Sequence, residues 1–158
     1  MAYHDDLLRL ASDLIERDVA TQAELRRAVS TAYYALFHLL VSETTLNWSR
    51  DSSRNALGRM FDHGMMKRVS DRVADSRKMS FAGEDPIAVS GLRLVAEAFV
   101  DLQDWRHTAD YDNSKFWNPL ETINAVARAG SAFVAWTQIK HTDIAQDYLV
   151  SLLIRPRD

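Results

Sequence analysis

The sequence contains no cysteine, only five glycines and three prolines, and no long apolar run. Without cysteine there is no disulfide framework, no thiolate metal site and no thiol nucleophile. The five histidines do not show the H-x-x-x-H or E-x-x-H spacing of metal-binding helices, so we expect no metal and no cofactor. No segment approaches the roughly 20 apolar residues that span a bilayer, and no signal peptide is visible. We therefore expect a cytoplasmic protein that does not contact a membrane.

The charge is balanced, with 19 basic and 22 acidic residues and a net charge of −3. This balance does not indicate binding of nucleic acid through bulk positive charge. Arginines nevertheless cluster at 26–27, 50–59 and 67–77, so a local basic patch is open as a possibility. The arginines at 50, 54 and 59 are consistent either with a solvated face or with contact to an RNA backbone.

Few helix breakers and an apolar period near 3.6 residues predict an all-α bundle of four to five main helices, arranged up and down. The length fits a single domain over 1–158, with a core from about 20 to 140. Capping signals at Thr21, Asp85, Asn118 and Thr142 mark helix starts. The expected helices cover about 3–17, 21–45, 85–110, 118–139 and 142–154.

The segment 46–84 has a weaker pattern. A short helix could begin at Asp51 or Ser52 and reach Phe61. His63-Gly64 looks like a helix end or a kink, because glycine commonly follows the last helical residue. Residues 65–74 are weakly amphipathic, and 75–84 have the composition of a loop.

One charged residue continues an apolar stripe. Leu92, Val95, Phe99 and Leu102 share a face of the helix that begins near Pro86, and Arg106 is the next position on that face. A guanidinium that faces a bundle interior needs partners, because an isolated buried charge is unfavourable. Asp110, one turn further on, could pair with it. Tyr111 could add a hydroxyl group.

The second helix carries a comparable polar line, made of Arg27, Thr31, Tyr34 and His38. If this line faces Arg106, the two helices enclose a pocket that could hold a phosphate, because arginine matches phosphate oxygens. The alternative is that Arg106, Asp110 and Tyr111 form a polar lock between packed helices, with Tyr34 and Thr31 as hydrogen-bonding partners between them.

Two segments carry a resemblance to a known family. Residues 26–38, of the form R-R-A-x-S-x-A-Y-Y-A-x-F-H, resemble the second-helix signature of HEPN-domain proteins. Residues 106–112 resemble the R-x-x-A-D-Y-D segment of small stand-alone members, and Phe61-Asp62-His63-Gly64 resembles a segment found between the two in some members. The resemblance spans about residues 20–140.

The resemblance implies a helical bundle, usually a homodimer, that associates with nucleotides or RNA. Some members are metal-independent ribonucleases, and some are toxins paired with a nucleotidyltransferase-like antitoxin. The nuclease members have R-x(4–6)-H spacing. Here Asp110 and Tyr111 occupy the region of that histidine, so Arg106 is the one catalytic candidate carried over. Arg59 and His63, with three residues between them, form a secondary pair.

Three functions therefore stay open. The first is a nucleotide- or RNA-associated domain without the usual histidine, for which the resemblance suggests a toxin–antitoxin or defence system. The second is a non-catalytic dimerisation or scaffold module. The third is an active ribonuclease that uses a non-standard histidine, since histidine suits proton transfer near neutral pH.

Overall fold

The computed structural model describes residues 1–155, which form seven helices and no strand. The helices are α1 (Tyr3–Ile15), α2 (Gln22–Thr45), α3 (Asp51–Gly58), α4 (His63–Ala74), α5 (Pro86–Tyr111), α6 (Pro119–Ile139) and α7 (Asp143–Leu153). The prediction of an all-α bundle is confirmed. Each of the five main helices expected from the sequence begins and ends within two residues of its predicted bounds.

Local capping explains why the helix starts could be predicted. Thr21 accepts the backbone N–H of Glu24, while the Glu24 carboxylate accepts the backbone N–H of Thr21. Asn118 and Glu121 form the same reciprocal pair at the start of α6. These contacts satisfy N–H groups that have no partner within the helix, and they involve residues only three positions apart.

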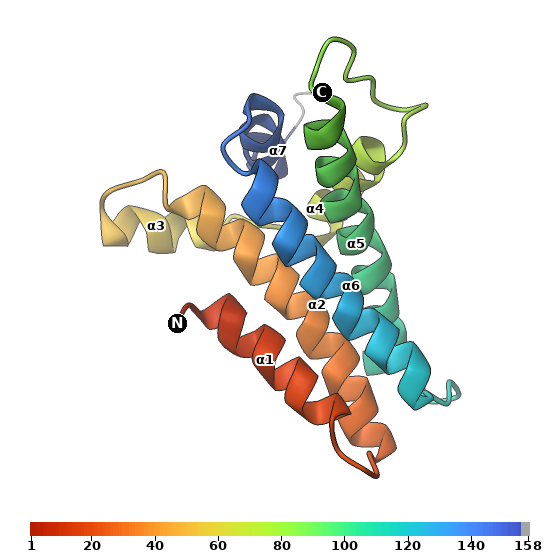
Figure 1. Cartoon of the computed structure of the whole chain (residues 1–158). Helices are drawn as coiled ribbons and strands as arrows, with labels where there is room; N and C mark the ends of the chain where they lie inside the picture. The colour runs from red at the N-terminus through yellow and green to blue at the C-terminus, as the bar shows by residue number, and fades with distance from the viewer. Residues whose placement is uncertain (156–158) are drawn as a thin grey trace.

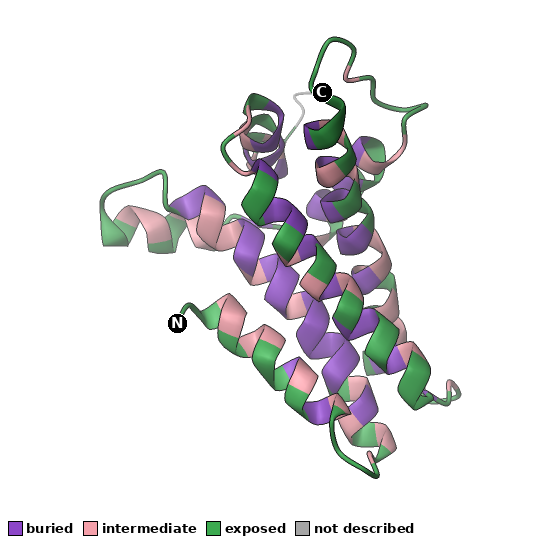
Figure 2. Ribbon diagram, in the orientation of Figure 1, coloured by how far each residue is buried: buried purple, intermediate pink, exposed green. Residues whose placement is uncertain are grey.

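The helices alternate in direction. In Figure 1, α1 and α5 run downward, and α2 and α6 run upward. Helices α2, α5 and α6 pack against one another, and α1 lies along α2. Figure 2 shows α2 buried along most of its length, which matches its place at the centre of the bundle. Its fully buried side chains meet those of α5 and α6 in one core, whose largest fully buried side chains are Tyr33, Phe99 and Trp136.

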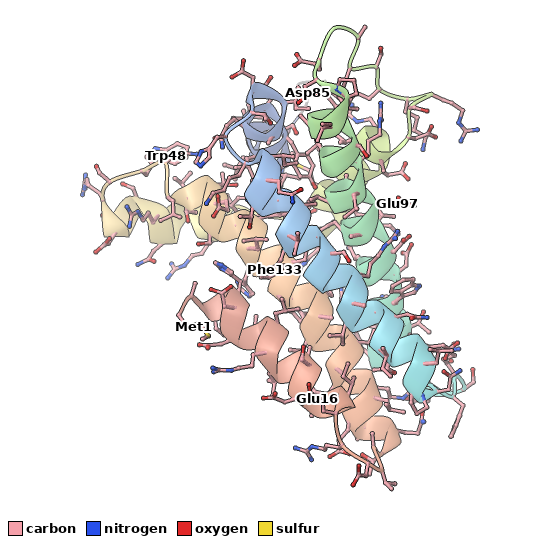
Figure 3. The ribbon with its side chains drawn as sticks, viewed as in Figure 1. Met1, Glu16, Trp48, Asp85, Glu97 and Phe133 are labelled. Carbon is pink, nitrogen blue, oxygen red and sulfur yellow. The ribbon has the colours of Figure 1, made fainter. Side chains whose placement is uncertain are left out.

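The close packing of α5 on α6 depends on a glycine. A Cβ atom built on Gly91 would lie 2.8 Å from Cγ2 of Ile139, which is closer than real Cβ contacts come. The absence of a side chain at Gly91 therefore lets the two helices approach. On the other side of α6, the ring of Phe133 lies 5.9 Å from the ring of His4, so α6 also contacts α1 (Figure 3).

The segment 46–84 holds two helices, α3 and α4. Helix α3 has no buried residue and projects from the bundle (Figures 1 and 2), with Trp48 on the connection before it (Figure 3). The expectation that His63-Gly64 ends or kinks a helix is wrong. His63 is the first residue of α4, because the Asp62 carboxylate caps that helix by accepting the backbone N–H of Met65 at 2.7 Å.

In the part of the chain that the structure describes, no helix is long and apolar enough to cross a membrane.

Candidate functional site

Arg106 lies in the last turns of α5, directly after the buried stripe that predicted its position. The four apolar residues before it on that face are fully buried, and the Arg106 side chain itself is 13% exposed. Its guanidinium carbon lies 5.2 Å from the centre of the Tyr33 ring and 5.9 Å from that of Tyr34. The charge therefore sits on the faces of two aromatic rings of α2, an attractive cation–π arrangement.

The guanidinium has few polar partners. Its Nη1 lies 3.7 Å from Oδ2 of Asp110, a separation that makes an ion pair but exceeds hydrogen-bonding distance. The same carboxylate oxygen accepts a hydrogen bond from the Ser30 hydroxyl at 3.4 Å. The Nε atom of Arg106 is buried and has no hydrogen-bond partner among the described residues. Since buried donors are nearly always paired in folded proteins, this arginine retains unused capacity for an acceptor.

A histidine lies beside this arginine. The Tyr33 hydroxyl is 2.5 Å from Nδ1 of His63, and the His63 ring stacks on Phe37 with ring centres 4.3 Å apart. The pKa of His63 is lowered, first by burial and then by the charge of Arg106, while Asp62 acts in the opposite direction. His63 is therefore neutral near neutral pH, and the Arg106 charge acts on it directly.

The Tyr33–His63 hydrogen bond is compatible with either tautomer of the histidine ring. Burial raises the pKa of Tyr33, so its hydroxyl stays protonated and can either donate to Nδ1 or accept the proton of Nδ1. When Nδ1 carries the ring proton, Nε2 of neutral His63 is free to accept a proton. We call the residues joined by these contacts the Arg106 cluster; they are Ser30, Tyr33, Tyr34, His63, Arg106 and Asp110.

The polar line predicted on α2 lies on a different surface from the one expected. Arg27, Thr31, Tyr34 and His38 together line a groove of about 490 Å³ between α2 and α1. The opposite wall is apolar and comes from α1, namely from Tyr3, Leu7, Leu10 and Leu14. Of the four predicted residues, Tyr34 alone also belongs to the Arg106 cluster, because the rest of the line faces α1 rather than α5.

His38 lies at one end of this groove. Its ring packs edge-on against the Tyr3 ring, with centres 4.9 Å apart. Burial lowers the pKa of His38, and the neighbouring His4 and His63 lower it further. The centre of the Tyr34 ring lies 6.5 Å from that of His38 and 6.2 Å from that of His63. The groove and the Arg106 cluster therefore adjoin at Tyr34.

Two predicted candidates lie outside this arrangement. Tyr111 is 66% exposed, and its ring packs on His107 at 5.0 Å instead of contacting Arg106. Arg59 is the exposed residue that follows α3, and it makes none of the contacts of the Arg106 cluster. The secondary pair is thus divided, with His63 in the cluster and Arg59 outside it.

Sequence reasoning missed Arg26. Its guanidinium donates to the backbone carbonyls of Ala109, Asp112 and Lys115, at 2.9, 2.9 and 2.5 Å. These bonds tie the C-terminal end of α5 and the loop after it to α2, which fixes Arg106 and Asp110 opposite their partners. Helix geometry shows that Arg26 and its neighbour Arg27 point in directions about 100° apart. It does not show which of the two faces the end of α5, so the role of Arg26 could be predicted only in part.

Among the described residues, no three His, Asp or Glu side chains gather as a metal ion would require. Comparisons of the chain with protein-family models, with curated proteins and with solved structures found no match.

Proposed function

We propose that this chain is a HEPN-like domain that binds the phosphate of a nucleotide or of RNA at the Arg106 cluster. The observation that carries the proposal is the buried Nε of Arg106, which has no hydrogen-bond partner within residues 1–155. A planar guanidinium with free donors matches the oxygens of a phosphate, and a charged acceptor makes stronger hydrogen bonds with it than a neutral one does. The cation–π contacts with Tyr33 and Tyr34 hold the guanidinium in place before a ligand arrives.

The α1–α2 groove supports the nucleotide part of this proposal. It combines one cationic and several polar side chains of α2 with a wall of leucines from α1. A nucleoside offers the complementary surfaces, an apolar base face and a polar ribose, and aromatic side chains stack readily on bases. Tyr34 belongs to both the groove and the Arg106 cluster, so one ligand could place its base in the groove and its phosphate near Arg106.

A second candidate is metal-independent cleavage of RNA, favoured by the position of His63 beside Arg106. In this reaction the 2′-oxygen attacks phosphorus and the 5′-oxygen leaves. His63, with its ring proton on Nδ1 and donated to Tyr33, would take the 2′-hydroxyl proton at Nε2 and return it to the leaving oxygen. Arg106 would stabilise the charge on the phosphorane oxygens. In this proposal His63 takes the role of the histidine that is missing after Arg106 in the R-x(4–6)-H pattern.

The test measures RNA binding by fluorescence anisotropy and then analyses the same samples on a gel for cleavage products. The variants are Arg106→Gln and His63→Gln, and Arg9→Gln removes one positive charge on the exposed face of α1 as a control. Loss of at least about tenfold in affinity in Arg106→Gln, with Arg9→Gln unchanged, supports phosphate binding. Products that disappear in His63→Gln while binding persists support cleavage.

The proposal is wrong if neither RNA nor a mononucleotide binds, or if Arg106→Gln binds as wild type does. A loss of stability in Arg106→Gln together with absent binding would instead favour the scaffold module.

The resemblance also motivates proposals about partners, namely a homodimer and a nucleotidyltransferase-like partner in a cytoplasmic toxin–antitoxin pair. Light scattering tests the dimer. Co-expression with such a protein encoded beside this chain tests the partner, through rescue of any growth defect.

A further inference from the structure

The outer face of α4 carries a cavity that the proposed function does not use. Its volume is about 880 Å³, and its apolar floor consists of Met65, Val69 and Ile154. The charged residues around that floor are Asp62, Arg68, Asp71, Arg72, Lys78 and Arg155. None of the residues of the Arg106 cluster or of the α1–α2 groove lines it.

The charges around this cavity are predominantly positive in a chain whose net charge is −3. Both acidic residues already have partners. Asp71 pairs with Lys78 at 2.5 Å, and the Asp62 carboxylate accepts the backbone N–H of Met65 as the cap of α4. Among residues 1–155, neither Arg68 nor Arg72 has a carboxylate within the 4.0 Å that defines an ion pair. Of the cavity's charged residues that come from α4, these two arginines are the ones without an ion-pair partner within residues 1–155.

The placement of these arginines is unfavourable without an anion. They are one helical turn apart on the same face of α4, and like charges at that spacing repel. In addition, the Arg68 side chain turns back toward the start of the helix, where its Nη1 lies 3.8 Å from the position of a Cβ on Gly64. A helix start carries partial positive charge and repels cations, and the Asp62 carboxylate, 3.4 Å from the same Cβ position, offsets part of this repulsion. An anion between the two guanidinium groups would offset both repulsions.

We propose that this cavity is a second binding site, which takes a phosphate monoester that carries an aromatic or aliphatic group. The phosphate binds Arg68 and Arg72, which can both donate to its oxygens. The organic group covers Ile154, which is 60% exposed, and its burial supplies the apolar part of the affinity. Met65 and Val69 are already buried and form the floor against which the group rests. The cavity volume is in the range of about 300–1,000 Å³ found for small-molecule pockets. The site is independent of phosphate binding at Arg106.

The test is isothermal titration calorimetry at low salt with two probes, adenosine 5′-monophosphate and inorganic phosphate. The double variant Arg68→Gln/Arg72→Gln is compared with Arg9→Gln/Arg77→Gln, which removes the same charge from exposed positions outside the cavity. Both arginines of the cavity are exposed, so the fold should survive, and circular dichroism checks it. The single variant Arg72→Gln gives a milder change if the double variant is unstable.

The expected result is that the monophosphate binds more tightly than inorganic phosphate. Its affinity for the cavity should fall by at least about tenfold in the double variant and stay within about twofold in the control. Absence of monophosphate binding overturns the proposal. So does an equal loss in the control, which would indicate general electrostatic attraction. A loss in Arg106→Gln instead of the double variant assigns the ligand to the Arg106 cluster and also overturns it.

Discussion

Replacing Arg106 by methionine distinguishes a role of this residue in ligand binding from a role as a polar lock between packed helices. The change keeps an unbranched side chain of similar length but removes the charge and all the N–H donors. Three contacts are lost with the guanidinium: the two cation–π contacts with Tyr33 and Tyr34, and the 3.7 Å ion pair with Asp110. One unfavourable feature is also removed, the buried Nε without a partner.

The free energy of the three contacts that are lost is similar in size to that of the unfavourable feature that is removed. The two cation–π contacts are worth about 0.5–1 kcal/mol each at partly exposed sites. The loose ion pair to Asp110, whose side chain is 30% exposed, adds about 0.3–0.5 kcal/mol. Removing an unsatisfied buried donor returns about 1–3 kcal/mol. We therefore expect the free energy of unfolding of Arg106→Met to lie within about 1.5 kcal/mol of wild type.

If Arg106 and Asp110 form a structural lock, the expected loss in the free energy of unfolding is larger. Breaking a buried ion pair that a fold depends on destabilises by about 3–5 kcal/mol. Urea unfolding followed by tryptophan fluorescence distinguishes the two values, because the chain has four tryptophans. Asp110→Asn is the matched control, since a lock requires both partners. A loss above about 3 kcal/mol in both variants would refute the reasoning, whereas a stable Arg106→Met that no longer binds phosphate would support it.

Three further changes test other contacts. Gly91→Ala should destabilise by about 1–3 kcal/mol in thermal unfolding, because its methyl group would overlap Ile139; an unchanged midpoint would contradict the close approach of α5 and α6. The pKa of His63 is lowered from 6.5 by folding, so its contribution to stability is complete above pH 6.5 and is lost as the pH falls toward the folded value. His63→Gln should flatten that part of the stability profile, whereas the exposed His141→Gln should not. Arg26→Gln should raise hydrogen exchange at the end of α5, where three carbonyls lose their donor.

The helices could be predicted because their signals are local. A capping pair such as Asn118 and Glu121 is complete within four residues, and so is the Asp85-Pro86 start of α5. The same local rule misled at Gly64. Glycine after a histidine was interpreted as the end of a helix, while the cap that decides the outcome, Asp62, comes just before. Asp62 satisfies a free N–H at the start of α4, so the helix begins there.

The site could be predicted only in part, because its contacts join distant segments. The position of Arg106 on a buried stripe followed from the helical period within α5. Its neighbour His63 is 43 positions away in sequence and meets it through Tyr33, a buried residue of α2. Nothing in the spacing of 46–84 places the first residue of α4, His63, beside Tyr33 of α2. A buried tyrosine usually has a hydrogen-bond partner for its hydroxyl group. This rule was the one signal that a residue such as His63 would lie beside Tyr33.

The arrangement of α2 explains why one helix serves two surfaces. Arg26 and Arg27 are adjacent, yet Arg26 holds the end of α5 and Arg27 lines the α1–α2 groove. Tyr33 and Tyr34 are divided in the same way, with Tyr33 fully buried against Phe99 and His63 and Tyr34 half-buried at the groove. Because both tyrosine rings contact the Arg106 guanidinium, a ligand that displaces the Tyr34 ring would change the surroundings of Arg106 and His63 as well. Binding in the groove and the protonation of His63 should therefore be coupled, and the titration of His63 should shift when a nucleotide binds.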